Sequence, residues 1–155
     1  MLAAVENGDA KKVAELMRQD PGFDVNELDV YGFTSLYYAC DCDSRSAVIP
    51  LLLAHPDIDA NVKNESGQSP FYYACYGNPS CVREMLKDSR VKVNEPNNYG
   101  FTPLWCAARW GHLDVIKWWI ASGREMDLGK PGDKRTDAIG AAKKCGTPGV
   151  VTLLE

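Results

Sequence analysis

Six cysteines and two histidines are the side chains in this 155-residue sequence that could ligate a metal or form disulfides. Cys40 and Cys42 form one close pair, but no second pair and no histidine follows at zinc-finger spacing. Cys40 and Cys75 each follow an alanine, so both would occupy one small-residue position of a repeated unit. Because free cysteine packs as a small hydrophobic side chain, we expect structural cysteines, no metal site and no cofactor.

Acid–base or nucleophilic catalysis would need convergent side chains that the spacing does not provide. His112 follows a glycine in a turn and His55 precedes Pro56, and neither has a carboxylate or nucleophile at a meaningful spacing. The sequence has no Walker or Gly-x-Gly-x-x-Gly loop and no Gly-x-Ser-x-Gly elbow. We therefore expect a protein that is not an enzyme.

The elements that must position these residues recur along the chain. The clearest copy is Gly100-Phe-Thr-Pro-Leu-Trp-Cys-Ala107, and copies of the same frame begin at Gly32 and Gly67. A ladder of alanines has spacings of 35, 35, 33 and 34 residues: Ala4, Ala39, Ala74, Ala107 and Ala141. A period near 33 predicts a solenoid, in which each unit buries its apolar face only against its neighbours.

The Gly-x-Thr-Pro-Leu-x-x-Ala frame resembles that of ankyrin-repeat proteins, over nearly the whole chain. The resemblance implies an all-α repeat solenoid of helix-turn-helix units with β-hairpin fingers at residues 26–32, 61–67, 94–100 and 127–134. We expect a single domain, residues 1–155, with units at about 1–26, 27–60, 61–93, 94–126 and 127–155. The first and last units are degenerate; Lys134 replaces the finger glycine and Asp137 the proline of the last one.

Local signals predict where the helices begin and end. Thr102 can cap a helix, Pro103 then falls at the first helical position, and Gly111 ends the helix. Pro50 interrupts the second helix of the second unit, where an interior proline would cost about 3 kcal/mol. We therefore predict a late helix start or a kink there, with Ser46 as the cap.

Composition narrows the function classes. No segment approaches the roughly 20 apolar residues of a membrane span, and no stretch resembles a signal peptide. Unpaired thiols then favour an intracellular location, cytoplasmic or nuclear. No basic stripe is interleaved with aromatic residues, so we predict no nucleic-acid binding.

Charge is distributed unevenly along the chain. Residues 1–70 carry 5 basic and 12 acidic side chains, whereas residues 71–155 carry 12 and 9. One interpretation is an ordinary solvated surface. The other is an elongated molecule whose acidic end faces a basic partner segment.

The resemblance also implies where a partner would bind. In ankyrin-like proteins the contact positions flank the finger glycine and follow the Ala-Ala pair of the first helix, on a concave face. Aromatic and arginine side chains at such positions typically form binding hot spots. Carried onto this chain, the partner-binding residues are Tyr31, Phe33, Asp41, Gln68, Tyr76, Asn98, Tyr99, Phe101, Arg109 and Trp110, with further positions near Arg135, Lys143 and Lys144. The alternative is that the finger aromatics pack between repeats.

These observations predict a monomeric, non-catalytic protein–protein interaction module that docks another protein on a preformed surface. The alternative is a structural spacer array within a larger multidomain protein. Exposed aromatics on the face would favour recognition, and aromatics buried between fingers would favour the spacer. The segment from Leu53 to Asn61 also resembles the pattern before a hydroxylated asparagine in some ankyrin-repeat proteins, which makes Asn61 a candidate modification site.

Overall fold

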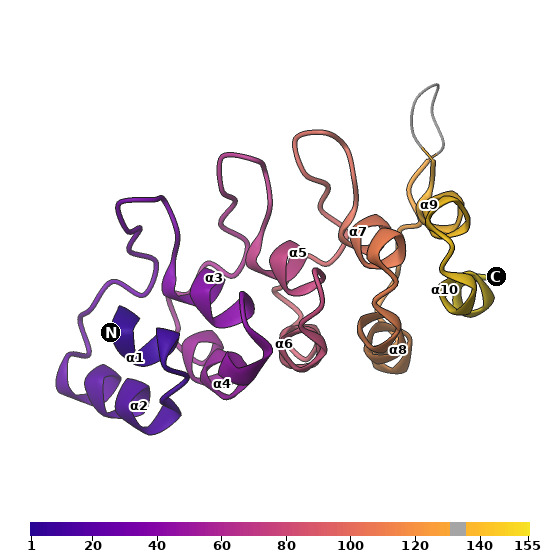
Figure 1. The fold of residues 1–155 in the computed structure, drawn as a ribbon. Helices are drawn as coiled ribbons and strands as arrows, with labels where there is room; N and C mark the ends of the chain where they lie inside the picture. The colour runs from indigo at the N-terminus through magenta and orange to yellow at the C-terminus, as the bar shows by residue number, and fades with distance from the viewer. Residues whose placement is uncertain (131–135) are drawn as a thin grey trace.

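The computed structural model describes residues 1–130 and 136–155, and it is an array of stacked helix pairs (Figure 1). The pairs, in chain order, are α1 (Leu2–Glu6) with α2 (Ala10–Gln19), α3 (Ser35–Cys40) with the 3₁₀ helix η1 (Asp43–Val48) and α4 (Ile49–Leu53), α5 (Pro70–Ala74) with α6 (Pro79–Leu86), α7 (Pro103–Trp110) with α8 (Leu113–Ser122), and α9 (Ala138–Cys145) with α10 (Pro148–Leu154).

The helices form two rows. The first helices of the pairs, α1, α3, α5, α7 and α9, lie in one row, and the second helices lie in the other (Figure 1). The finger segments project beyond the row of first helices, and the two chain ends lie at opposite ends of the array (Figure 1). The predicted all-helical solenoid is therefore confirmed.

The core runs continuously between the rows. The ladder alanines Ala39, Ala74 and Ala107 are fully buried, and their small size lets neighbouring first helices pack closely. Trp119 of α8 is fully buried and meets Phe71 of the preceding unit edge to face, with ring centroids 5.1 Å apart. Each unit therefore buries its apolar residues partly against the next one.

The predicted start of α7 is confirmed. Thr102 has extended backbone geometry, and its hydroxyl oxygen accepts a hydrogen bond from the Trp105 N–H at 3.2 Å. Pro103 occupies the first turn, and α7 ends at Gly111, whose φ is +73°. Threonine or serine caps α3 and α5 in the same way, so one local signal starts three first helices.

The second helix of the second unit begins late, as Pro50 predicts. Residues 43–48 form the 3₁₀ helix η1, and α4 begins only at Ile49, which places Pro50 in the first turn where its missing N–H costs little. The predicted cap was wrong, because the residue before α4 is Val48 and Ser46 lies inside η1.

Two further helix starts differ from the sequence pattern. Asn78 precedes α6 without capping it; instead Asp43 of the preceding unit accepts from the Ser80 N–H at 2.7 Å and the Ser80 hydroxyl at 2.9 Å. In the last unit Asp137 caps α9 through the Gly140 N–H at 2.7 Å, so it is the cap residue and not a residue of the first helical turn. Lys134 lies outside the described residues.

The first three fingers are not strand pairs, because the described part of the chain contains no strand. Residues 131–134 of the predicted fourth finger lie outside the described residues. Each of the first three fingers has two backbone bonds at its tip, for example from the Asn97 N–H to the Phe101 carbonyl and from the Gly100 N–H to the Asn97 carbonyl, both at 2.9 Å. The Asn97 side-chain oxygen accepts from the Tyr99 and Phe101 N–H groups at 3.0 and 3.1 Å. Because this side chain takes the N–H groups that a ladder would use, the segment forms a loop instead of the expected β-hairpin.

Asparagines at the base of the fingers join each unit to the next. The side-chain nitrogens of Asn26, Asn61 and Asn94 donate to backbone carbonyls about one repeat away, at 2.7, 2.9 and 3.1 Å. Their side-chain oxygens accept from backbone N–H groups of the same distant segments, at 2.8, 2.8 and 2.9 Å. We call these three side chains the asparagine staples.

Candidate partner-binding face

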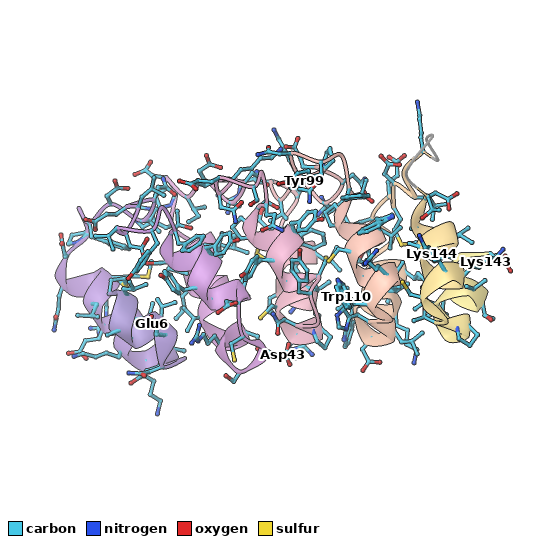
Figure 2. All side chains as sticks on the ribbon, turned by 45° about the horizontal axis from the view of Figure 1, so that its top comes forward. Glu6, Asp43, Tyr99, Trp110, Lys143 and Lys144 are labelled. Carbon is cyan, nitrogen blue, oxygen red and sulfur yellow. The ribbon has the colours of Figure 1, made fainter. Side chains whose placement is uncertain are left out.

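The finger-side face is the surface formed by the fingers and by the exposed side of the first helices. Figure 2 shows Tyr99 on a finger, Trp110 on α7, and Lys143 and Lys144 on α9. Four of the predicted aromatic contact residues are exposed, with exposed fractions of 74% for Tyr31, 42% for Tyr76, 67% for Tyr99 and 58% for Trp110. Large exposed aromatics of this kind are typical of interaction surfaces.

Phe33 and Phe101 are placed differently from these four. Phe33 stacks on Tyr37 with ring centroids 4.6 Å apart, and Phe101 stacks on Trp105 at 4.0 Å. Both phenylalanines are half-buried, and each attaches a finger to the first helix of its own unit. The predicted set therefore contains both exposed aromatics and aromatics that pack inside the repeat.

Tyr37, Tyr72 and Trp105 occupy one equivalent position of three successive units and link each unit to the next. The Tyr37 hydroxyl accepts from the Asn64 amide at 2.7 Å, and the Tyr72 hydroxyl accepts from the Asn97 amide at 3.1 Å. Burial raises the pKa of both tyrosines well above the ordinary value, so they stay neutral. Indole has no acceptor, and Trp105 instead donates its Nε1–H to the Thr136 carbonyl at 2.9 Å.

One cleft on this face lies between α3 and α5. We call it the acidic cleft; it has a volume of about 380 Å³ and is lined by Asp41, Gln68, Tyr73, Tyr76 and Asn78. The Gln68 amide donates to the Tyr76 hydroxyl at 3.0 Å and accepts from Asn64 at 3.2 Å. Asp41 lies 3.8 Å from Arg45. The polar groups of this cleft are thus largely engaged with one another.

A second cleft lies between α7 and α9. We call it the cationic cleft; it has a volume of about 320 Å³ and is lined by Phe101, Trp105, Arg109, Thr136, Ala141, Lys144 and Cys145. The Arg109 guanidinium lies 5.3 Å from the Trp105 ring centroid and 5.4 Å from that of Trp110. Two cations and an aromatic floor therefore meet in one depression. Lys143 lies beside it but pairs with Glu155 at 2.7 Å, and Arg135 lies outside the described residues.

Asn98 connects two fingers. Its side-chain nitrogen donates to the Glu65 carbonyl at 2.7 Å, and its backbone N–H donates to the Ser66 carbonyl at 3.0 Å. A Cβ on Gly67, whose φ is +75°, would lie 2.7 Å from the backbone nitrogen of Asn98. The backbone of one finger thus fits closely against the next, and the Asn98 amide is used within the protein.

The cysteines and histidines do not converge on a site. Burial raises the pKa of Cys40 and Cys75 well above the thiol value, whereas the Ser44 hydroxyl lowers that of the more exposed Cys42. Across residues 1–130 and 136–155, no three His, Cys, Asp or Glu side chains are grouped as metal ligands would be. His112 lies against Gly77 in the neighbouring turn, and burial lowers its pKa.

Stacked helix pairs with a continuous shared core define the class of helical repeat proteins. A family model described as "Ankyrin repeats (3 copies)" matches residues 45–130, more than half of the sequence, and the chain belongs to the ankyrin-repeat family. Proteins of this family are generally protein-interaction modules and are typically non-catalytic. Among the described residues, no helix has the length and apolar character needed to cross a membrane.

Several curated proteins are similar to this chain. "SMC5-SMC6 complex localization factor protein 1" of Bos taurus and that of Homo sapiens are each 36% identical over 104 residues, which is 63% of this chain and 9% of those proteins. "Putative ankyrin repeat protein" of Rickettsia bellii is 29% identical over 98 residues, 63% of this chain and 54% of that protein. The chain therefore spans less than two thirds of the length of these relatives.

Proposed function

We propose that this chain is a non-catalytic protein-interaction module that binds a segment of another protein on its finger-side face, as a concave docking surface. The observation that carries the proposal is Trp110, which is 58% exposed beside the guanidinium of Arg109. A solvated indole next to an arginine is costly to leave uncovered and is enriched at the centre of interfaces. The relatives named for localising a protein complex support a protein-binding role.

A rigid surface favours this mode of binding. The asparagine staples and the Asn98 bridge hold neighbouring fingers in fixed positions, so a partner does not have to order the loops on docking. A preformed surface loses less conformational entropy when it binds. Tyr76 contributes from the turn after α5 and Tyr99 from a finger, which extends the proposed contact over two units.

The test is a pull-down with the immobilised chain and with a Tyr76→Ala, Tyr99→Ala, Trp110→Ala triple variant. The variant omits Phe101, because that ring stacks on Trp105 and its loss would perturb the fold. We expect the parent to retain a protein that the triple variant loses. The matched control is Trp118→Ala with Ile120→Ala, two exposed apolar residues of α8 in the other helix row. Equal retention by all three proteins would contradict the proposal.

A spacer array inside a larger protein is the second candidate. It is favoured by the packed rings of Phe33 and Phe101 and by the small share of the bovine and human relatives that the chain spans. A spacer would hold flanking domains without a ligand of its own. The same pull-down separates the two, because a spacer retains nothing through Trp110.

We further propose an intracellular, cytoplasmic or nuclear, monomer. Six free cysteines, four of them buried, suit a reducing compartment. Expression of a tagged chain would test the location, and light scattering would test the monomer. Hydroxylation of Asn61 also stays a prediction: its amide bonds the backbone of Arg90 and Lys92 near the end of the same unit, so mass spectrometry should find any modification at low occupancy in the folded protein.

A further inference from the structure

The finger-side face changes its charge from one end of the array to the other. The acidic cleft holds Asp41, whereas the cationic cleft holds Arg109 and Lys144. Figure 2 shows the same trend at the ends, with Glu6 on α1 of the first unit and Lys143 and Lys144 on α9 of the last. A partner lying along this face would therefore meet opposite charges at its two ends.

Among residues 1–130 and 136–155, the two cations of the cationic cleft have no paired counter-charge. Neither Arg109 nor Lys144 makes an ion pair or a hydrogen bond with a described residue, and no described residue lining the cleft is a carboxylate. Several other surface cations are paired, such as Lys63 with Glu95 at 2.7 Å and Lys87 with Glu84 at 2.9 Å. An anion entering the cleft would therefore not have to displace a described counter-charge.

The Arg109 guanidinium is already oriented. It packs against the rings of Trp105 and Trp110, and contacts with ring faces leave its in-plane N–H groups available for an acceptor. Trp105 is itself fixed by its bond to Thr136 and by the Phe101 stack. Carboxylates bind such a planar fork through two parallel hydrogen bonds, which are stronger than bonds between neutral groups.

The size of the cleft limits its occupant. A volume of about 320 Å³ admits one or two side chains and excludes a folded element. The aromatic floor suits the methylene groups of a glutamate, and Trp110 at the rim suits an apolar or aromatic neighbour of that residue. An extended acidic peptide segment meets all of these conditions.

We propose that the cationic cleft between α7 and α9 binds a carboxylate side chain of an acidic segment of the partner protein, with Arg109 and Lys144 as its ligands. The inference rests on the proposed function and adds the chemistry of the partner. From the cleft the segment continues over Trp110 toward Tyr76, which sets its direction along the array.

The experiment is a selection of random peptides, displayed on phage, against the immobilised chain of residues 1–155. We expect the selected peptides to carry glutamate or aspartate next to an aromatic or apolar residue. A synthetic copy of one such peptide is then measured by calorimetry beside its Glu→Gln or Asp→Asn analogue. The amide analogue should bind about tenfold more weakly or worse, since it loses charge-assisted hydrogen bonds.

Protein variants provide the second arm. The double variant Arg109→Gln with Lys144→Gln should weaken the acidic peptide by about tenfold or more, as the amide analogue does. The matched control, Lys87→Gln with Lys117→Gln, removes the same charge from the end of α6 and the middle of α8 in the other helix row, and it should leave the affinity unchanged. The peptide analogue is read on the unaltered protein, so a misfolded variant cannot decide the result.

The outcomes separate the inference from the function. Peptides that require Trp110 but lack acidic residues, or that bind the double variant as well as the parent, overturn the acidic-segment inference and leave the interaction module standing. A selection with no peptide that depends on Trp110 contradicts both. Equal competition by a DNA oligomer of the same charge would also overturn the inference, because it would show a general attraction for anions.

Discussion

The acidic cleft and the cationic cleft lie at equivalent junctions of one repeat, yet they are built differently. In the first, Gln68, Tyr76 and Asn64 satisfy one another, and Asp41 lies near Arg45. In the second, an indole replaces the tyrosine of the linking position, and Arg109 packs on that indole without a described counter-charge. The repeat frame thus fixes the backbone, while a few side chains decide whether a junction is closed or open to a ligand.

The largest expected effect comes from removing Trp105, which tests the difference between the two clefts. Trp105→Ala deletes the Phe101 stack and the bond to Thr136, and we expect a loss of about 3 kcal/mol in the free energy of unfolding. Because the bond to Thr136 joins α7 to the last unit, amide exchange should accelerate most in α9 and α10. Trp118→Ala, which removes an exposed indole in the other helix row, is the control and should cost far less. Unchanged protection of α9 would argue against Trp105 as the link.

A second test compares two fingers. Gly67→Ala places a Cβ 2.7 Å from the Asn98 nitrogen at a φ of +75°, whereas Gly32→Ala, at a φ of +79°, meets no atom within 4 Å. Backbone strain alone should cost about 1 kcal/mol at Gly32, and the added clash should bring Gly67→Ala to about 2 kcal/mol or more. Urea denaturation would measure both. Equal costs would show that the fingers of units three and four are not closely fitted.

The tyrosine link allows a finer test. Tyr72→Phe removes the acceptor of the Asn97 amide and should cost about 1 kcal/mol, because that amide is left without its partner. Tyr73→Phe is the matched control: no hydrogen bond of its hydroxyl is found among the described residues, so its cost should stay below about 0.5 kcal/mol. Thermal unfolding of the two variants would rank them. A reversed order would remove Tyr72 as a link between units.

The smallest expected effect is a pH dependence at the turn between the clefts. Burial lowers the pKa of His112 below its ordinary value of 6.5, so the unfolded chain binds this proton more readily than the folded one. The stability contributed by His112 is therefore complete above about pH 6.5 and declines as the pH falls through the folded pKa. His112→Gln should reduce the change of the urea midpoint with pH between about pH 7.5 and about pH 5.5. An unaltered slope would contradict this assignment.

Much of the fold could be predicted because its signals are local. Thr102, Pro103 and Gly111 act on their own helix, and Pro50 forces a late start whatever surrounds it. The cap of α6 could not be predicted, because its acceptor is Asp43, 37 residues earlier. The first three fingers form loops and not the predicted β-hairpins for a related reason. Side chains such as Asn97 accept hydrogen bonds from the N–H groups that a strand ladder needs.

The candidate site is less predictable than the fold. Repeat phase alone cannot tell that Phe101 stacks on Trp105 while Tyr99 is exposed, since both flank the same glycine. The asparagine staples recur at a regular spacing in the sequence. The groups that Asn61 bonds could not be predicted, because they are the backbone carbonyl of Arg90 and the backbone N–H of Lys92, and every residue except proline offers both groups. That Arg109 and Lys144 line the same cleft depends on how closely α7 and α9 approach each other.

The placement of the four tryptophans has an optical consequence. Trp119 is buried in the core and Trp118 lies in the other helix row, whereas Trp105 lines the cationic cleft and lies, like Trp110, beside the Arg109 guanidinium. Emission from Trp105 and Trp110 should change when a ligand alters the charge beside the rings, while the core indole reports only on unfolding. Tryptophan fluorescence should therefore report ligand binding at the cationic cleft through Trp105 and Trp110, and unfolding through Trp119, without an added label.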